Sequence, residues 1–190
     1  AAVRRLLSHA IDDCLREAEL SIAAAIADPS PSPFSAAETL SRLAVTLKAL
    51  EAGPSPEGVN FAVRLAAALS AAQSLAEKRF QHLLGGAIGA RFTVIAEAGP
   101  AASDDDVADA EALARAVAKI HAAGASLGCS ERLANAARPW RDDMRRRIVA
   151  AAQATPDPAK GFSAAIDGLR LLEIALGADQ AAALADSIGV

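Results

Sequence analysis

The sequence predicts an all-α protein, a multi-helix bundle of about seven to nine helices. The first reason is composition, because 53% of the residues are hydrophobic but only 3% are aromatic, and there is no tyrosine. Much of the hydrophobic share is alanine, which loses no side-chain entropy in a helix and lacks the branching that strands favour. The second reason is that apolar residues recur three or four positions apart between breaks rich in proline and glycine.

The first two segments are expected to form a helical hairpin. An amphipathic helix over residues 3–27 ends at the alternating prolines of residues 28–33, which cannot continue a helix. Ser35 and Glu38 form a capping box at the start of the second helix. The apolar face expected for the first helix contains Val3, Leu7, Ile11, Cys14, Ala18, Ile22 and Ala25.

Four leucines of the second helix lie at coiled-coil spacing and form the candidate oligomer seam: Leu40, Leu43, Leu47 and Leu50. The two helices differ in length, so the shorter one cannot cover the whole apolar stripe of the longer one. Joining two copies covers such faces, most often as a two-fold dimer, and we therefore expect a homo-oligomer. In the competing arrangement the C-terminal helices cover these faces and the chain is a monomer.

The middle of the chain holds a longer helix and one ambiguous segment. The third helix is expected over residues 59–84, apolar on two faces and ended by Gly85 and Gly86. Residues 92–95 would suit a strand, but no other segment offers a partner strand. We therefore expect a short buried helix there.

The second half is expected to be helical throughout. Ser103 and the three aspartates that follow it suit a helix start, and Gly128 suits the end of the same helix. Pro139 suits a first helical turn, so two separate helices are expected on either side of it. The predicted ranges are 104–127, 130–138, 139–154, 162–176 and 179–188.

The loop from Gly99 to Ser103 is the best interior boundary. It divides the chain into an N-terminal part, residues 1–98, with the hairpin and the central helix, and a C-terminal helical subdomain, residues 99–190. The alternative is a single domain over residues 1–190.

Residues 124–147 resemble a helix-turn-helix motif, with Gly124 and Gly128 at the turn and Ser130 as the cap of the second helix. In such motifs the second helix lies in the DNA major groove. The net charge of −4 gives no global reason to expect nucleic acid, so DNA is possible but not favoured. The candidate contacts to nucleic acid or to a protein partner are Arg132, Asn135, Arg138, Arg141, Arg145, Arg146 and Arg147.

Two further motifs have structural explanations. His121, with Gly124 after it, resembles the phosphoacceptor helix of histidine phosphotransfer domains, but the lysine that follows in that family is absent. Residues 105–109 match the aspartate motif with which prenyl-diphosphate enzymes bind Mg²⁺, yet acids in a first turn are favoured by the helix dipole. We expect no catalytic residue, metal or cofactor, and we expect Cys14 and Cys129 to be buried and unpaired.

The expected function is a non-enzymatic protein-interaction, adaptor or assembly module in the cytoplasm, or in an organelle if a targeting segment has been removed. Its partner is another protein or a second copy, and no membrane segment is expected. One alternative is a DNA-binding regulator that uses residues 124–147, which requires its arginines on one exposed face. Another is a small-molecule-binding protein or enzyme, which requires a pocket with convergent polar groups.

Overall fold

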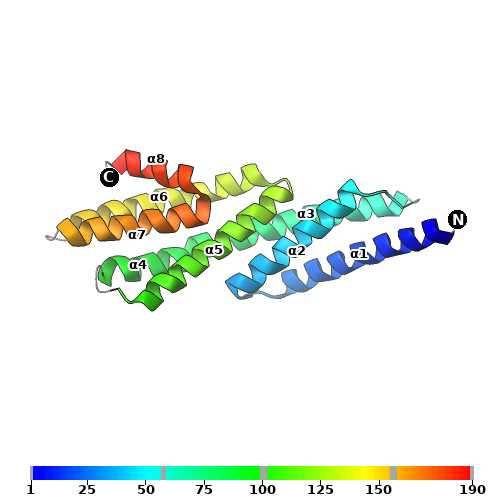
Figure 1. The fold of residues 1–190 in the computed structure, drawn as a ribbon, viewed down its shortest axis with the longest axis horizontal. Helices are drawn as coiled ribbons and strands as arrows, with labels where there is room; N and C mark the ends of the chain where they lie inside the picture. Colours follow the sequence, from blue (N-terminus) through cyan, green and yellow to red (C-terminus); the bar gives the residue numbers. More distant parts are fainter. Residues whose placement is uncertain (1, 57–58, 99–101, 155–157, 189–190) are drawn as a thin grey trace. The chain divides into compact units, whose positions relative to one another are not determined.

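A computed structural model describes residues 2–56, 59–98, 102–154 and 158–188. This part of the chain is helical and contains no strand, so the predicted all-α class is confirmed. The elements are α1 (Ala2–Ala27), α2 (Pro33–Ala52), α3 (Val59–His82), a π-helical turn (Leu83–Ile88), α4 (Gly89–Ala98), α5 (Asp104–Ser126), α6 (Ser130–Ala154), α7 (Pro158–Leu176) and α8 (Ala178–Ile188) (Figure 1). No helix in these ranges is both long enough and apolar enough to span a membrane.

The chain divides into two compact units that are interleaved in sequence. Unit 1 comprises Ala1–Arg79 and Ile120–Leu133, and unit 2 comprises Phe80–Lys119 and Ala134–Val190. The three crossings between units fall inside α3, α5 and α6. Three long helices therefore contribute to both units, and the division into domains at residue 99 stays a prediction.

In unit 1, α1 packs along α2 as the expected hairpin. The second helix begins earlier than the capping box predicts: Ser32 is the N-cap, its Oγ accepts a hydrogen bond from Ser35 N at 3.2 Å, and Pro33 occupies the first turn. Proline suits that position because the first N–H groups of a helix have no partner inside it.

Two arginines of α3 form hydrogen bonds to α1 and to the residue that follows it. Arg64 donates two hydrogen bonds to the carboxylate of Glu19, at 2.9 and 2.7 Å, and one to Asp12 at 2.6 Å. Further along, Arg79 donates to the backbone oxygens of Ala25, at 2.8 Å, and Asp28. Residue numbers rise together along both helices, so α1 and α3 run parallel.

In unit 2, α7 packs against α4 and α8. Gly168 of α7 allows a close approach, since a Cβ there would lie 2.7 Å from Phe92 in α4 and 2.6 Å from Ile148 in α6. Glu111 of α5 is buried and forms ion pairs at 2.6 Å with Arg115 and with Arg170 of α7. The short buried helix predicted around residues 92–95 is confirmed as α4, with Phe92 and Ile95 in the core.

Two predicted helix breaks are wrong. Gly85 and Gly86 do not end α3, because the chain continues through the π-helical turn directly into α4. Pro139 lies inside α6 rather than at the start of a new helix. Pro139 itself is exposed, and the buried face of α6 continues past it at helical spacing. The packing of that face outweighs the backbone hydrogen bond that a proline cannot donate. The buried residues of that face are Leu133, Ala137, Trp140, Met144 and Ile148.

Candidate functional site

The predicted arginine cluster of α6 is not gathered on one face. Arg132 donates to Gln73 of α3 at 2.7 Å and pairs with Glu77 at 3.6 Å, within unit 1. In unit 2, Arg141 donates to Gln180 of α8. Arg147 donates to Thr93 of α4 at 2.7 Å, on the other side of the buried face.

The remaining candidates on α6 lie on its exposed side and mostly have neighbouring partners. Arg138 donates to Asn135 at 3.3 Å, and Arg146 pairs with Asp143 at 3.2 Å. The pKa of Asp143 is lowered by hydrogen bonds from Arg147 and Arg146. Only Arg145 of this set makes no ion pair or hydrogen bond to the residues that the structure describes. The arginines of α6 therefore lie on more than one side of the helix, and the DNA-binding alternative stays a prediction.

The turn between α5 and α6 is held by the chain's own packing. Gly128 has a φ of 86°, and a Cβ on Gly124 would overlap Leu133. The Sγ of Cys129 donates to the oxygen of Gly124 at 3.0 Å, and burial raises the pKa of this thiol. Cys129 is buried as predicted, whereas Cys14 is exposed, so the prediction for Cys14 is wrong.

His121 and the aspartates of residues 105–109 lie among contacts that belong to the fold itself. His121 is half-buried, and burial lowers its pKa. At the start of α5, Ser103 Oγ accepts a hydrogen bond from Asp106 N at 3.1 Å, and Arg91 pairs with Asp109 at 3.4 Å. Within the described ranges, no group of three or more His, Cys, Asp or Glu residues could hold a metal ion.

The leucine seam lies in the core of unit 1. All four residues, Leu40, Leu43, Leu47 and Leu50, are buried. Their side chains are covered by the chain itself and are not presented to a second copy. A dimer that used them would first have to separate α2 from its neighbours.

Three of the large exposed apolar residues of unit 1 lie within two turns at the start of α1, while Leu20, Ile26, Phe34, Val45 and Val63 are exposed elsewhere in the unit. Val3, Leu6 and Leu7 are 80%, 70% and 50% exposed. Val3 and Leu7 were expected on the core face, but the core residues of α1 are Leu15, Ala18 and Ile22. Helical spacing places five exposed residues on one side of the helix, and we call this set the α1 strip: Val3, Leu6, Leu7, Ala10 and Cys14.

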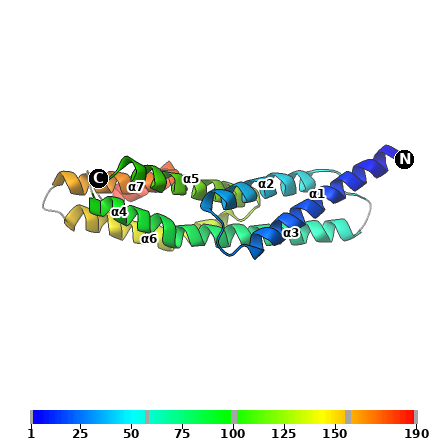
Figure 2. The same ribbon diagram turned by 90° about the horizontal axis from the view of Figure 1, so that it is seen from below.

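The lengths of the helices explain why the first part of the strip, from Val3 to Leu7, is uncovered. Helix α1 has 26 residues and α2 has 20, so α1 is longer by 26 − 20 = 6 residues. At 1.5 Å per residue this is about 9 Å. Figure 2 shows the first turns of α1 extending past the ends of α2 and α3. The prediction that the shorter helix cannot cover the longer one agrees with this geometry.

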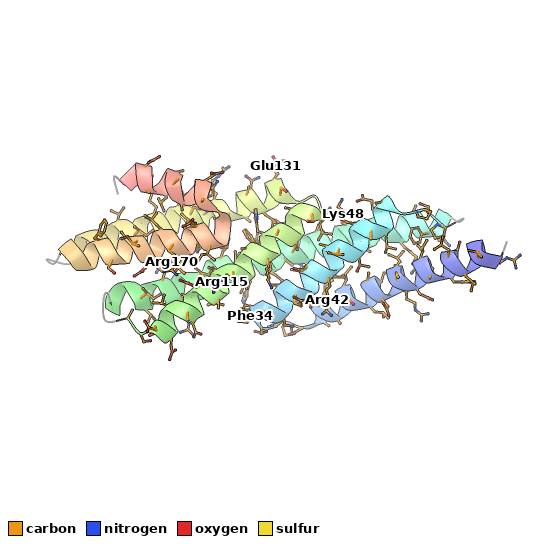
Figure 3. The ribbon with its side chains drawn as sticks, viewed as in Figure 1. Phe34, Arg42, Lys48, Arg115, Glu131 and Arg170 are labelled. Atoms are coloured by element: carbon orange, nitrogen blue, oxygen red, sulfur yellow. The ribbon has the colours of Figure 1, made fainter. Side chains whose placement is uncertain are left out.

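Unit 1 also contains a pocket of about 290 Å³ where the end of α1 meets α2 and α3. Its floor is apolar and includes Ala36, Leu40 and Leu75. Figure 3 shows Arg42 on α2 between Phe34 and Lys48. The polar lining comprises Ser21, Asp28, Ser35, Thr39, Arg42 and Arg79.

No known protein family model, curated protein or solved structure matches the chain. The candidate site therefore depends on the geometry alone. Sequence reasoning missed Leu6 and Ala10 because they lie off the face that was assigned to the core. It missed the pocket because Arg42 belongs to an exposed helix face with no recognisable motif.

Proposed function

We propose that this protein is a non-enzymatic assembly module that associates with a second copy of itself through the α1 strip. The observation that carries this proposal is the exposure of Val3, Leu6 and Leu7 where α1 extends past α2. Contiguous apolar side chains on a soluble domain mark interaction sites more often than single exposed ones. An amphipathic helix is also the kind of partner that such a strip accepts.

The charges along α1 favour an antiparallel pair. Arg5 lies near the start of the helix, and Asp13 and Glu17 lie two to three turns further along. With a two-fold axis near residues 9 and 10, Arg5 of each helix lies beside these acids of the other. A parallel pair would instead bring like charges together.

The number of apolar side chains in the strip determines the affinity that we expect for the dimer. Burial of a valine or leucine side chain contributes about 1.5–3 kcal/mol, and each copy supplies three such residues. Association costs about 4–15 kcal/mol in lost freedom, so the net affinity is modest. We expect a dissociation constant in the micromolar to millimolar range.

Sedimentation of the full chain over a wide concentration range tests the proposal. The mass should rise with concentration from 19.3 kDa towards twice that value. Leu6→Glu should keep the protein monomeric, because it places a charge in the centre of the strip. The matched control is Val45→Glu, at a position 73% exposed on α2, which should dimerise like the unaltered protein. A monomer at every concentration, or equal loss of dimer in both variants, contradicts the proposal.

Oxidative cross-linking tests the orientation, since Cys14 is exposed and Cys129 is buried. In the antiparallel pair the two Cys14 residues are about 13 Å apart along the axis and should not link. Residue 10 faces its own symmetry mate, so Ala10→Cys combined with Cys14→Ser should form a linked dimer. A disulfide through Cys14 in the unaltered protein would indicate a parallel pair.

A further inference from the structure

The pocket of unit 1 is built from two facing rows of side chains. On α2, Ser35, Thr39 and Arg42 follow one another at positions i, i+4 and i+7, which places them on one side of the helix. On the facing row, Ser21 lies in α1 and Asp28 follows its last residue, seven positions further along the chain. The pocket therefore has hydroxyl groups along both sides and charged groups towards its ends.

Of its three charged groups, only Arg42 makes no hydrogen bond or ion pair to the described residues. The guanidinium of Arg79 donates to backbone oxygens at the end of α1. Asp28, of opposite charge, lines the same pocket and accepts a hydrogen bond from Ser30 N at 3.1 Å. Arg42 forms no ion pair or hydrogen bond to the described residues. Arg42, Arg79 and Asp28 together carry one net positive charge, and Arg42 is the guanidinium whose N–H groups are not used by the described residues.

We infer that this pocket binds a small monocarboxylate with a short apolar tail. A guanidinium presents two parallel N–H groups that match a carboxylate, and Ser21 and Thr39 add hydroxyl donors. The apolar floor, including Leu40 and Leu75, suits a hydrocarbon tail. A volume of about 290 Å³ lies at the lower end of ligand pockets, so the ligand is small. A phosphate dianion does not match the single available charge.

This binding does not depend on self-association, because the pocket and the α1 strip share no residue. Failure of one proposal leaves the other standing.

Titration of the full ¹⁵N-labelled chain with butyrate, followed through the amide signals of Ser35 and Thr39, tests the inference. We expect saturable shifts at millimolar butyrate, since Arg42 is exposed and an exposed ion pair is weak. n-Butanol, which has the same tail without the charge, should bind several-fold more weakly than butyrate, and inorganic phosphate should give no saturable shift at these residues.

Two variants distinguish the contribution of the positive charge of Arg42 from that of the pocket volume. Arg42→Gln should weaken butyrate binding about fivefold, the factor that one exposed ion pair supplies. Ser21→Leu should abolish binding by filling the pocket without changing its charge. Arg138→Gln, at an exposed arginine of unit 2, is the matched control and should bind like the unaltered chain.

Several outcomes would overturn the inference. These are no saturable shift up to tens of millimolar butyrate, equal binding by Arg42→Gln, and shifts caused equally by n-butanol. Binding of phosphate without butyrate would assign the pocket to a different ligand class.

Discussion

The two units each contain a three-residue ion cluster, and the clusters are opposite in charge. In unit 1, Arg64 lies between two acids, Asp12 and Glu19. In unit 2, Glu111 lies between two bases, Arg115 and Arg170. The central side chain is 35% exposed in the first cluster and 9% exposed in the second. Water can therefore replace a lost partner of Arg64 far more readily than a lost partner of Glu111.

The largest effect should follow from removing both partners of Glu111. Arg115→Ala combined with Arg170→Ala leaves a buried carboxylate without a counter-charge, and we expect the free energy of unfolding to fall by about 3 kcal/mol. Figure 3 labels these arginines on α5 and α7. The measurement is urea unfolding of the full chain.

Adding Glu111→Gln to that double variant is the decisive control. A neutral side chain of similar size should recover most of the lost stability, because the cost arises from the isolated charge. If the triple variant is as unstable as the double one, the arginines act through packing and the comparison between the clusters fails.

The next effect concerns the close packing that brings Arg170 to Glu111. Gly168 lies two positions before Arg170, and a Cβ there would lie 2.6 Å from Ile148 Cγ1. Gly168→Ala should therefore displace α7 and destabilise the protein by about 1–3 kcal/mol in urea unfolding. The matched change is Gly85→Ala in the π-helical turn, where a Cβ would meet nothing within 4 Å. That variant should be neutral or more stable by up to about 1 kcal/mol, and equal losses in both variants would contradict this account.

The fold class could be predicted because the strongest signals are local. Alanine content, periodicity and proline breaks act within a single segment, and most helix ranges follow from them. The exceptions depend on tertiary packing: α6 continues through Pro139 because the buried face from Leu133 to Ile148 continues across it. Gly85 and Gly86 stay in a helical turn although both residues are weak helix formers.

The candidate site was less predictable because it depends on the register between helices. On α1, the helix face that contains Cys14 and the face that contains Leu15 both carry apolar residues. The structure buries Leu15 and leaves Cys14 exposed, and the pattern within α1 alone does not distinguish the two faces. The arginines of α6 are close in sequence but point to different neighbours, such as Gln73 and Thr93. No periodicity in a single segment reveals which partner each side chain will meet.

The smallest effect compares two carboxylates whose pKa values move in opposite directions. The hydrogen bond from Arg64 lowers the pKa of Glu19 from 4.5. The folded state therefore binds fewer protons than the unfolded state near that pH, and the stability from this pair, present above about pH 4.5, is lost as the pH falls. For Asp167, burial raises the pKa above 3.8 although Arg170 opposes the shift. The folded state then binds more protons, and the associated stability is lost as the pH rises.

Glu19→Gln should therefore lower the urea midpoint at pH 7 and flatten its fall towards about pH 3. Asp167→Asn should raise the midpoint slightly at pH 7, because it removes a charge that burial disfavours, and should change it little at about pH 3. The two variants are each other's controls, since both replace a carboxylate by an amide of similar size. If both move the midpoint at pH 7 in the same direction, the loss of a negative charge from an acidic protein explains the result, and the local environments of the two carboxylates do not.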